Sequence, residues 1–150
     1  MSILCWDEAE GGWDRTTKSV GGSPRGVGIG DANNDGYRDI VTANYDSDTV
    51  GILCWNSSTT DWNAPIIKSV GNGPLDVEIG DTTNNGQNEI VVPNFFADTV
   101  SILCWNESKG NWNDQLTESV GAEPYAVSIG DANNDGLNDI VTPNREFGAV

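Results

Sequence analysis

The sequence predicts an all-β protein built from one structural unit that occurs three times. The chain of 150 residues matches itself at a period of 50 residues, as the motif SVG at Ser19, Ser69 and Ser119 shows. Segments rich in β-branched and aromatic residues alternate with clusters of Gly, Asn, Asp and Pro, a pattern typical of short strands and turns. No segment carries apolar residues at helical spacing over three turns. Repeats of this length usually stack on their neighbours to bury a shared core.

Four strands are predicted in each repeat, and the third copy shows them most clearly. They are expected at 98–105 (DTVSILCW), 112–120 (WNDQLTESV, the weakest), 125–131 (YAVSIGD) and 138–144 (NDIVTPN). Four short strands in each period are typical of a β-propeller blade, a four-stranded antiparallel sheet repeated around an axis. A stacked β-solenoid is the alternative, although its coils are usually shorter than 50 residues.

The strand order predicts how the chain is divided. With 125–131 as the innermost strand, we expect an outer half-blade at 1–20, complete repeats at 21–70 and 71–120, and an inner half-blade at 121–150. Propellers usually contain 4–8 blades, so three blades do not readily close a ring. We therefore expect ring closure by oligomerisation, in which the start of one chain pairs with the end of another. A homodimer with six blades is the first expectation, and a homotrimer with nine is the alternative.

Charge and composition exclude several classes of function. With 23 acidic and 7 basic residues, the net charge of −16 repels nucleic acid and anionic membranes and attracts cations. Membrane insertion is not expected, because nowhere do 18 apolar residues follow one another. The absence of histidine excludes His-dependent catalytic triads and the usual acid-base residue, so an enzyme is the least favoured reading.

The three cysteines occupy equivalent positions in successive repeats, at Cys5, Cys54 and Cys104. A regular array holds equivalent positions apart, so we expect free thiols that are small buried hydrophobic groups and form no disulfide, with a reactive one only where an open end of the array exposes it.

The first residues, MSILCWDEAEGG, do not form a signal peptide, so this chain does not by itself indicate a cellular location. Met1 stands where Val50 and Val100 precede the other copies, which places the start of the sequence inside a repeat. A trimmed, duplicated or engineered propeller fragment without an evolved ligand is therefore one interpretation.

An acidic loop is the most regular part of the repeat. It reads GDANNDGYRDIV at 30–41 and GDANNDGLNDIV at 130–141, so both copies contain D-x-N-x-D-G-x-x-D. Oxygen atoms at positions 1, 3, 5 and 9, the backbone carbonyl of position 7 and a Gly at position 6 suit Ca²⁺. The predicted ligands are Asp31, Asn33, Asp35, Tyr37 and Asp39, and Asp131, Asn133, Asp135, Leu137 and Asp139. Asn, Asp and Gly also form ordinary turns, but such turns do not need carboxylates at positions 1, 5 and 9 together.

The middle copy of the loop, GDTTNNGQNEIV, carries only two carboxylates. Its corresponding residues are Asp81, Thr83, Asn85, Gln87 and Glu89. Fewer anionic ligands predict a weaker calcium site. In every copy the expected role of the ion is structural, because a cation offsets the repulsion among carboxylates in one loop.

The pattern VxIGDxNxDGxxDIV at 27–41 and 127–141 resembles the FG-GAP family, the calcium-binding propeller repeat of integrin α subunits, and its bacterial relatives of the VCBS type. The resemblance covers all three repeats, although the middle copy departs from the ligand pattern and the family's own letters survive only as FGAV at 147–150. It implies calcium in the loop between the two inner strands of each blade, bound by Asp31, Asn33, Asp35, Asp39 and their third-copy counterparts. It also implies an extracellular or cell-surface location.

Six tryptophans form three pairs with a spacing of seven residues. The first members, Trp6, Trp55 and Trp105, are expected to pack between blades. The second members are expected to be more open and are candidate ligand-binding residues: Trp13, Trp62 and Trp112. The favoured function is a calcium-stabilised, non-catalytic module for binding or adhesion, with a protein or glycan ligand. A lectin with one sugar site on each blade is the alternative, in which these tryptophans stack on sugar rings.

Overall fold

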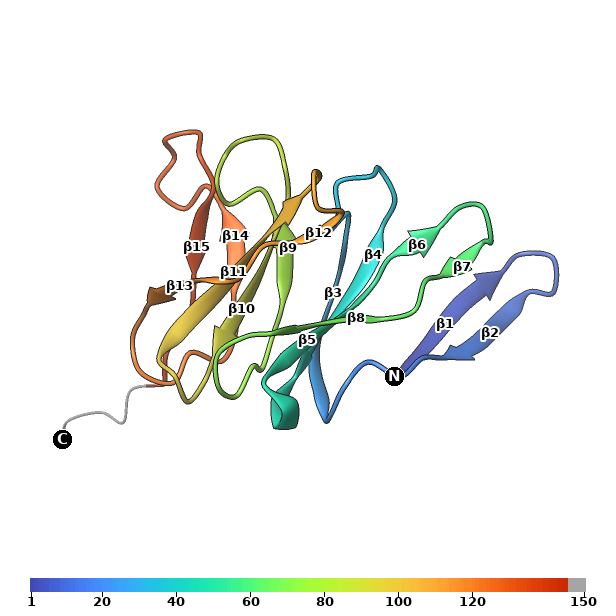
Figure 1. The fold of residues 1–150 in the computed structure, drawn as a ribbon, viewed down its shortest axis with the longest axis horizontal. Helices are drawn as coiled ribbons and strands as arrows, with labels where there is room; N and C mark the ends of the chain where they lie inside the picture. Colours follow the sequence, from blue (N-terminus) through green and yellow to red (C-terminus); the bar gives the residue numbers. More distant parts are fainter. Residues whose placement is uncertain (146–150) are drawn as a thin grey trace.

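The structure is a computed structural model that describes residues 1–145. It consists of β-strands and one short 3-10 helix, which confirms the all-β prediction. The strands form four successive units that follow one another along the long axis of the molecule (Figure 1). No sheet within residues 1–145 closes on itself. The expected inner half-blade at 121–150 lies partly outside the described residues, and the letters FGAV at 147–150 lie wholly outside them.

The first unit is an N-terminal hairpin of two antiparallel strands, β1 (Ser2–Asp7) and β2 (Gly12–Thr17). The turn between them ends at Gly11, whose φ of +66° is a conformation that glycine adopts without a steric penalty.

The second unit, here called the first sheet, has the antiparallel order β3-β4-β5-β8. Its strands are β3 (Pro24–Gly30), β4 (Asp39–Asn44), β5 (Thr49–Leu53) and β8 (Ile66–Ser69). The 3-10 helix η1 (Tyr45–Ser47) joins β4 to β5, and a small hairpin of β6 (Trp55–Asn56) and β7 (Asp61–Trp62) lies between β5 and β8 in the sequence.

The third unit, here called the second sheet, repeats this arrangement. It contains β9 (Glu78–Gly80), β10 (Glu89–Asn94), β11 (Thr99–Asn106), β12 (Asn111–Trp112) and β13 (Leu116–Ser119). The long strand β11 pairs with β10 on one side and with both β12 and β13 on the other. The strand predicted at 112–120 is therefore present as two short strands.

The fourth unit is a C-terminal hairpin of β14 (Ser128–Gly130) and β15 (Asp139–Val141). Strand β15 has 3 residues, whereas its counterparts β4 and β10 have 6 each. The counterparts are each paired on both edges, but β15 pairs only with β14 in the described part of the chain.

Apolar side chains are buried between successive units rather than within one of them. One cluster, which includes Val41, Ile52 and Ile90, lies between the first and second sheets. Neighbouring residues of one strand face opposite sides, so Ile52 belongs to this cluster while Leu53 packs toward the N-terminal hairpin. Stacking of this kind is expected for repeat proteins, whose stability comes largely from contacts between neighbours.

The inner strands of successive units approach each other closely, because glycine on one strand faces isoleucine on the next. A Cβ atom added at Gly30 would lie 2.9 Å from Ile79, and one added at Gly80 would lie 3.2 Å from Ile129. A larger residue at Gly30 would therefore require Ile79 to shift, and one at Gly80 would crowd Ile129. The third member of the series, Gly130, has no atom within 4 Å of such a Cβ.

Candidate metal loops

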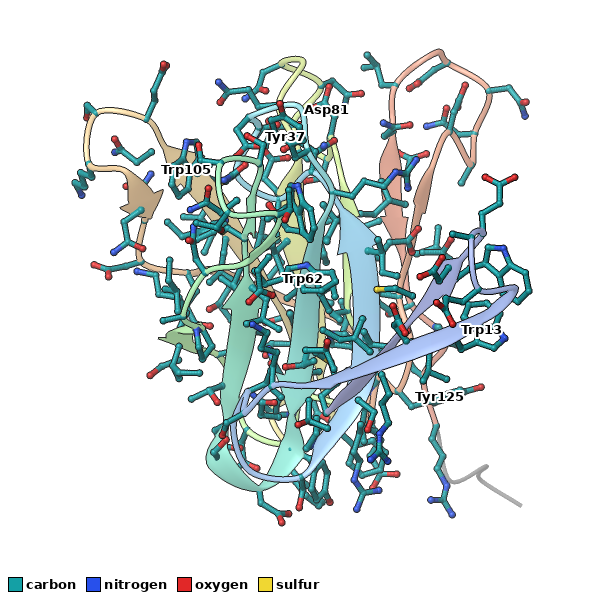
Figure 2. All side chains as sticks on the ribbon, turned by 90° about the vertical axis from the view of Figure 1, so that its right-hand side faces the viewer. Trp13, Tyr37, Trp62, Asp81, Trp105 and Tyr125 are labelled. Atoms are coloured by element: carbon teal, nitrogen blue, oxygen red, sulfur yellow. The ribbon has the colours of Figure 1, made fainter. Side chains whose placement is uncertain are left out.

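Three equivalent loops connect the inner strands of the first sheet, the second sheet and the C-terminal hairpin. The first loop (31–38), the middle loop (81–88) and the third loop (131–138) lie along one edge of the molecule, at the top of Figure 1. Figure 2 shows Tyr37 of the first loop and Asp81 of the middle loop at this same end.

The loops share one backbone conformation, with two left-handed residues in each. The φ angles are 58°, 57° and 64° at Asn34, Asn84 and Asn134, and 90°, 86° and 89° at Gly36, Gly86 and Gly136. Asn and Gly are the residues that adopt this region most readily, so the local sequence favours the same turn three times.

The first loop wraps around the carboxylate of Asp31. Oδ1 of Asp31 accepts the N–H of Asp35 at 2.9 Å, and Oδ2 accepts the N–H of Gly36 at 2.8 Å. Oδ1 of Asn33 accepts the same Asp35 N–H at 3.1 Å, so two predicted ligand oxygens lie beside each other. Oδ1 of Asp35 accepts the N–H of Tyr37 at 2.9 Å. The Tyr37 side chain is exposed.

The third loop repeats these contacts. Asp131 accepts the N–H groups of Asp135 and Gly136 at 3.1 and 2.9 Å, and Asn133 accepts the Asp135 N–H at 2.8 Å. Asp135 in turn accepts the N–H of Leu137, whose side chain is exposed. The structure therefore brings together the residues predicted at positions 1, 3 and 5 in both of these loops.

The middle loop keeps only part of the arrangement. Asp81 accepts the N–H groups of Asn85 and Gly86, and Asn85 accepts the N–H of Gln87. The hydroxyl of Thr83 instead donates to Glu89 at 3.2 Å. Because Thr83 contacts Glu89, its oxygen is directed to the base of the loop.

The carboxylate at position 9 is placed differently from the others. Asp39 is fully buried, and its Oδ2 accepts the N–H groups of Ala32 and Asn33 at 3.1 and 3.3 Å while its Oδ1 accepts the N–H of Trp55 at 2.9 Å. Burial raises the pKa of the Asp39 carboxyl, the N–H donors oppose this change, and the charge of Asp35 adds to it. Asp39 thus holds the loop from behind and ties it to the outer strands.

Glu89 and Asp139 occupy the same position in the other copies. Glu89, also buried, accepts the N–H groups of Thr82 and Thr83 at 2.9 and 3.2 Å. Asp139 is only half-buried and accepts the N–H of Ala132 at 3.0 Å. The sequence pattern does not reveal this bracing role, since a carboxylate at position 9 is equally consistent with a metal ligand.

The donor chemistry of the first and third loops fits calcium. Each combines two carboxylates with an amide oxygen and a backbone carbonyl, all of which are hard oxygen ligands. Within residues 1–145, no group of three or more His, Cys, Asp or Glu side chains is placed to hold a metal ion. Any site in these loops therefore depends on the Asn side chain and the backbone as well as on the carboxylates.

A hydrogen-bonded clasp connects each loop to the next. Oδ1 of Asn34 accepts the N–H of Asn88 at 2.7 Å, and Nδ2 of Asn34 donates to the Asn88 carbonyl at 3.1 Å. Nδ2 of Asn88 donates to the carbonyl of Asp31 at 2.9 Å. The same three bonds join Asn84, Asn138 and Asp81. Sequence reasoning missed the clasp, although the occurrence of Asn at the fourth loop position in every copy was a signal for it.

The tryptophans form three edge-to-face pairs, with ring centroids 5.3, 4.9 and 4.7 Å apart. Trp112 is only 2% exposed and packs between the first and second sheets, so the expectation that it is open is wrong. Trp62 is half-buried against the N-terminal hairpin, whereas Trp13 is 64% exposed on that hairpin, which faces the viewer in Figure 2. The second tryptophan of a pair packs on the preceding unit, and no unit precedes Trp13 within residues 1–145.

The burial of the cysteines follows the same gradient. All three are free, with Cys5 exposed, Cys104 half-buried and Cys54 buried. Burial is therefore confirmed for Cys54, while Cys5, in the N-terminal hairpin, is the exposed thiol expected at an open end. Burial raises the pKa of the Cys54 thiol to about 12, and the nearby charges of Asp39 and Asp35 add to this effect.

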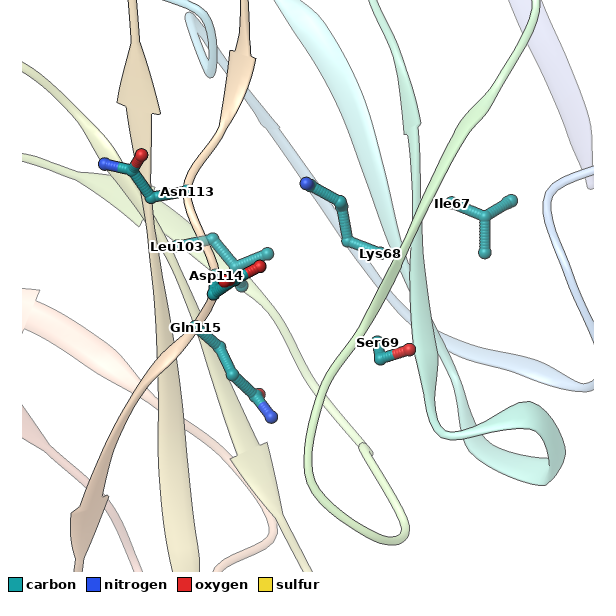
Figure 3. A pocket seen from close by; sticks show the side chains of 7 residues that line it. All are labelled: Ile67, Lys68, Ser69, Leu103, Asn113, Asp114 and Gln115. Carbon is teal, nitrogen blue, oxygen red and sulfur yellow. The ribbon is translucent and has the colours of Figure 1, made fainter. Parts of the chain in front are cut away.

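A pocket of about 390 Å³ lies between the outer parts of the two sheets (Figure 3). It is lined by Ile67, Lys68, Ser69, Leu103, Asn113, Asp114 and Gln115. Lys68 points across the gap toward the segment that carries Asn113 and Asp114. None of the three candidate tryptophans lines this pocket, so it is a polar cleft rather than an aromatic platform.

Comparison with known proteins finds one family that matches part of the chain. The family model of the FG-GAP-like repeat matches residues 31–92, which extend from the first loop through the first sheet to β10. A search of curated proteins found no match for the chain. Residues 1–145 contain no helical segment with the length and apolarity that a bilayer span requires.

Proposed function

Because residues 31–92 form an FG-GAP-like repeat, a non-catalytic repeat of propeller-like proteins, we propose that this chain is a calcium-stabilised β-propeller scaffold that acts as a binding or adhesion module. The observation that carries the proposal is the pair of acidic loops, the first and the third, which present the same donor set on the same backbone turn. Their position along one edge of the molecule makes them suitable for an ion that stiffens that edge.

In this proposal the first loop binds calcium through Asp31, Asn33, Asp35 and the carbonyl of Tyr37. The third loop uses the equivalent residues. Calcium supplies positive charge that offsets repulsion between the carboxylates, while Asp39 adds negative charge and fixes the loop from behind. The middle loop is weaker, because Thr83 contacts Glu89 and only Asp81 remains as a carboxylate in the turn itself.

The scaffold is proposed to form a ring by assembly of copies, with a homodimer of six blades as the first choice and a homotrimer of nine as the second. Propellers usually have 4–8 blades, and the described chain contains two full sheets and two hairpins. An extracellular or cell-surface location agrees with this function, since calcium outside cells is abundant enough to fill sites of modest affinity.

The ligand is proposed to be a protein or glycan that binds a face of the ring. A lectin site repeated on each blade has less support, because Trp112 is buried and cannot serve as a sugar platform. The polar pocket beside Lys68 offers such a ligand a concave site between the outer parts of the two sheets.

Calcium titration tests the proposal. Isothermal titration calorimetry of the 150-residue chain should give two sites with dissociation constants on the order of 10⁻⁴ to 10⁻³ M, the range of extracellular calcium modules. The melting temperature should rise with calcium concentration, because a ligand that binds only the folded state stabilises it by mass action.

Variants assign the sites. Asp31→Asn and Asp131→Asn should each remove one site, whereas Asp14→Asn, which changes an exposed carboxylate outside the loops, should leave both. Asn85→Asp should strengthen the middle site by restoring a carboxylate at position 5. A melting temperature that does not respond to calcium would contradict the proposed function.

A further inference from the structure

We propose that the C-terminal hairpin and third loop of one copy are completed by the N-terminal hairpin and first sheet of a second copy, with Trp6, Ile29 and Arg38 as the key residues of the joint. This inference rests on the ring closure included in the proposed function and names the surfaces that form it. The two joints already present within the chain support it, because residues that are exposed at one end have less exposed counterparts there.

The N-terminal hairpin presents an apolar face without a neighbour in the described chain. Leu4 is 58% exposed, whereas its counterparts Leu53 and Leu103 are at most 1% exposed because the preceding unit covers them. Trp13 shows the same contrast with the buried Trp112. The face of the N-terminal hairpin that bears Leu4 is therefore a blade interface that lacks its partner.

The C-terminal hairpin likewise presents an apolar residue that no neighbour covers in the described chain. Val141 is 48% exposed, whereas its counterparts Val41 and Val91 are fully buried. In the second sheet, β10 pairs with β11 so that Ile90 faces Leu103 and Val91 faces Ile102. The same register applied to β15 and β1 pairs residue 140 with residue 4 and residue 141 with residue 3. This pairing would complete a four-stranded blade in the order β14-β15-β1-β2.

The inner strands also match across the two ends. Ile29 is 63% exposed, while the equivalent Ile79 and Ile129 pack against Gly30 and Gly80 of the preceding inner strand. The glycine that should receive Ile29 is Gly130, which faces open space within the chain. The exposed Ile29 side chain and the open space beside Gly130 that would receive it are thus both present on one chain, at opposite ends.

The third loop lacks contacts that a second copy would supply. Asp39 accepts the N–H of Trp55, and the counterpart of Trp55 for Asp139 is Trp6 of the second copy. Ala32 is fully buried by its neighbours, whereas Ala132 is exposed. The set of hydrogen bonds to the Asp139 carboxylate, which holds the third loop from behind, is therefore complete only after assembly. Assembly should thus favour the loop conformation that binds calcium.

At this joint the clasp between loops would involve an arginine in place of the asparagine that the other two joints use. Asn34 and Asn84 bind the backbone of Asn88 and Asn138, and the corresponding partner of Asn134 is the exposed Arg38. Backbone bonds to Asn134 remain available with any residue at that position. A guanidinium instead of an amide brings a positive charge beside an acidic loop, so the joint between copies is electrostatically complementary.

A second copy is favoured over an unrelated partner because the two exposed surfaces fit each other. Both are parts of the same repeating interface, in the same register, and two copies placed head to tail would cover all four exposed ends. A cyclic arrangement of this kind closes without leaving free sheet edges.

The decisive test fills the hole at Gly130. Gly130→Val should leave the fold of the isolated chain intact, since no atom lies within 4 Å of the added Cβ, but it should block entry of Ile29 from another copy. Native mass spectrometry should show the wild type at twice the monomer mass of 16.0 kDa and Gly130→Val at the monomer mass, with unchanged circular dichroism.

Adding Ile29→Ala to Gly130→Val restores space at the joint and should restore the dimer. Arg38→Glu should weaken the wild-type dimer by about tenfold or more, because it places like charges together. A trimer that responds to these substitutions in the same way also supports the joint. A monomeric wild type, or a Gly130→Val variant that remains dimeric, overturns the inference.

Calcium binding measured on the same samples separates the two proposals. If the substitutions switch the mass as expected but calcium does not bind, the joint stands and the calcium-stabilised function fails. If the first loop binds calcium in a wild-type chain that stays monomeric, the calcium proposal stands and the joint fails.

Discussion

The side chain of Asn34 and the backbone of Asn88 form a two-way clasp across 54 residues of sequence, in which Asn34 both accepts the N–H and donates to the carbonyl. The clasp couples the first and middle loops directly, independently of the apolar core below them. Two of its bonds use the backbone of residue 88 and fix the position of that residue, whereas the third uses the Asn88 side chain, which donates to the Asp31 carbonyl.

Asn34→Ala should lower the free energy of unfolding by about 2 kcal/mol, since two hydrogen bonds worth about 1 kcal/mol each are lost. Urea denaturation of the monomeric Gly130→Val variant would measure this effect. Asn134→Ala is the matched control in the same background, because no following loop lies within residues 1–145 to be clasped. Equal losses from the two substitutions would show that the clasp contributes nothing beyond the turn itself.

Asp39→Asn should destabilise the calcium-free protein by about 3 kcal/mol, because a buried carboxylate that accepts three N–H groups is replaced by an amide with one acceptor oxygen. Asp139→Asn should cost only about 1 kcal/mol in the monomeric background, where that carboxylate accepts the N–H of Ala132. Chemical denaturation in the presence of a chelator would compare the two. If Asp39 serves only as a metal ligand, its substitution will have no effect without calcium.

Trp112→Ala should reduce stability by about 3–5 kcal/mol, the usual cost of removing a large buried aromatic side chain. Trp13→Ala in the monomeric background should cost less than about 1 kcal/mol, because this side chain is mostly in contact with solvent. Thermal or urea unfolding of the two variants provides the comparison. Similar losses would indicate that the edge-to-face pairing, present in both, dominates over packing between units.

The ion pair of Lys18 with Asp61, at 2.8 Å, connects the segment after the N-terminal hairpin to the β6–β7 hairpin and should make stability depend on pH. The hydrogen bond from Lys18 lowers the pKa of Asp61 below its ordinary value of 3.8. A carboxyl group with a lowered pKa stabilises the folded state above pH 3.8, and this contribution disappears as the pH falls through the lowered value.

The stability difference between the wild type and Asp61→Asn should thus be present at pH 7 and vanish in strong acid. The difference should be small and should shrink with added salt, because Asp61 is exposed. Urea midpoints at several pH values would measure it. A difference that persists in strong acid would show that the ion pair is not its source.

Alkylation of the thiols should distinguish the three cysteines. Cys54 should remain unmodified at pH 8 until the protein unfolds, because it is buried and its pKa is about 12. Cys5 should react quickly in the monomeric variant and slowly in the assembled protein, where it would take the place that Cys54 has behind the first loop. Mass spectrometry of peptides after timed iodoacetamide treatment would give these rates. Equal rates for Cys5 in both states would argue that this part of β1 stays open.

The repeat pattern was sufficient to predict strands because segments rich in β-branched and aromatic residues are bounded by Gly, Asn, Asp and Pro. Strand β11 lies within one residue of the predicted 98–105 at each end. The strand predicted at 112–120 divides into β12 and β13, since β11 continues far enough to pair with two separate segments. Such a division depends on the partner strand, which local sequence does not describe.

The convergence of the loop residues was predictable from the sequence, but the contacts of the carboxylate at position 9 were not. Asp31 and Asn33 converge as the spacing predicts, because the turn through Asn34 and Gly36 is encoded locally. Asp39, a predicted ligand, begins a buried strand, and its oxygens accept N–H groups that burial would otherwise leave unpaired. Trp112 was misjudged for a related reason, since its exposure depends on the preceding unit rather than on its own repeat.

The fit of Ile79 beside Gly30, repeated by Ile129 beside Gly80, has a consequence for the inheritance of this architecture. Both of these joints within residues 1–145 use the same small-against-large contact, so neither specifies how many repeats the array contains. A gene that gains or loses one 50-residue segment would preserve this contact between neighbours and change only the number of repeats.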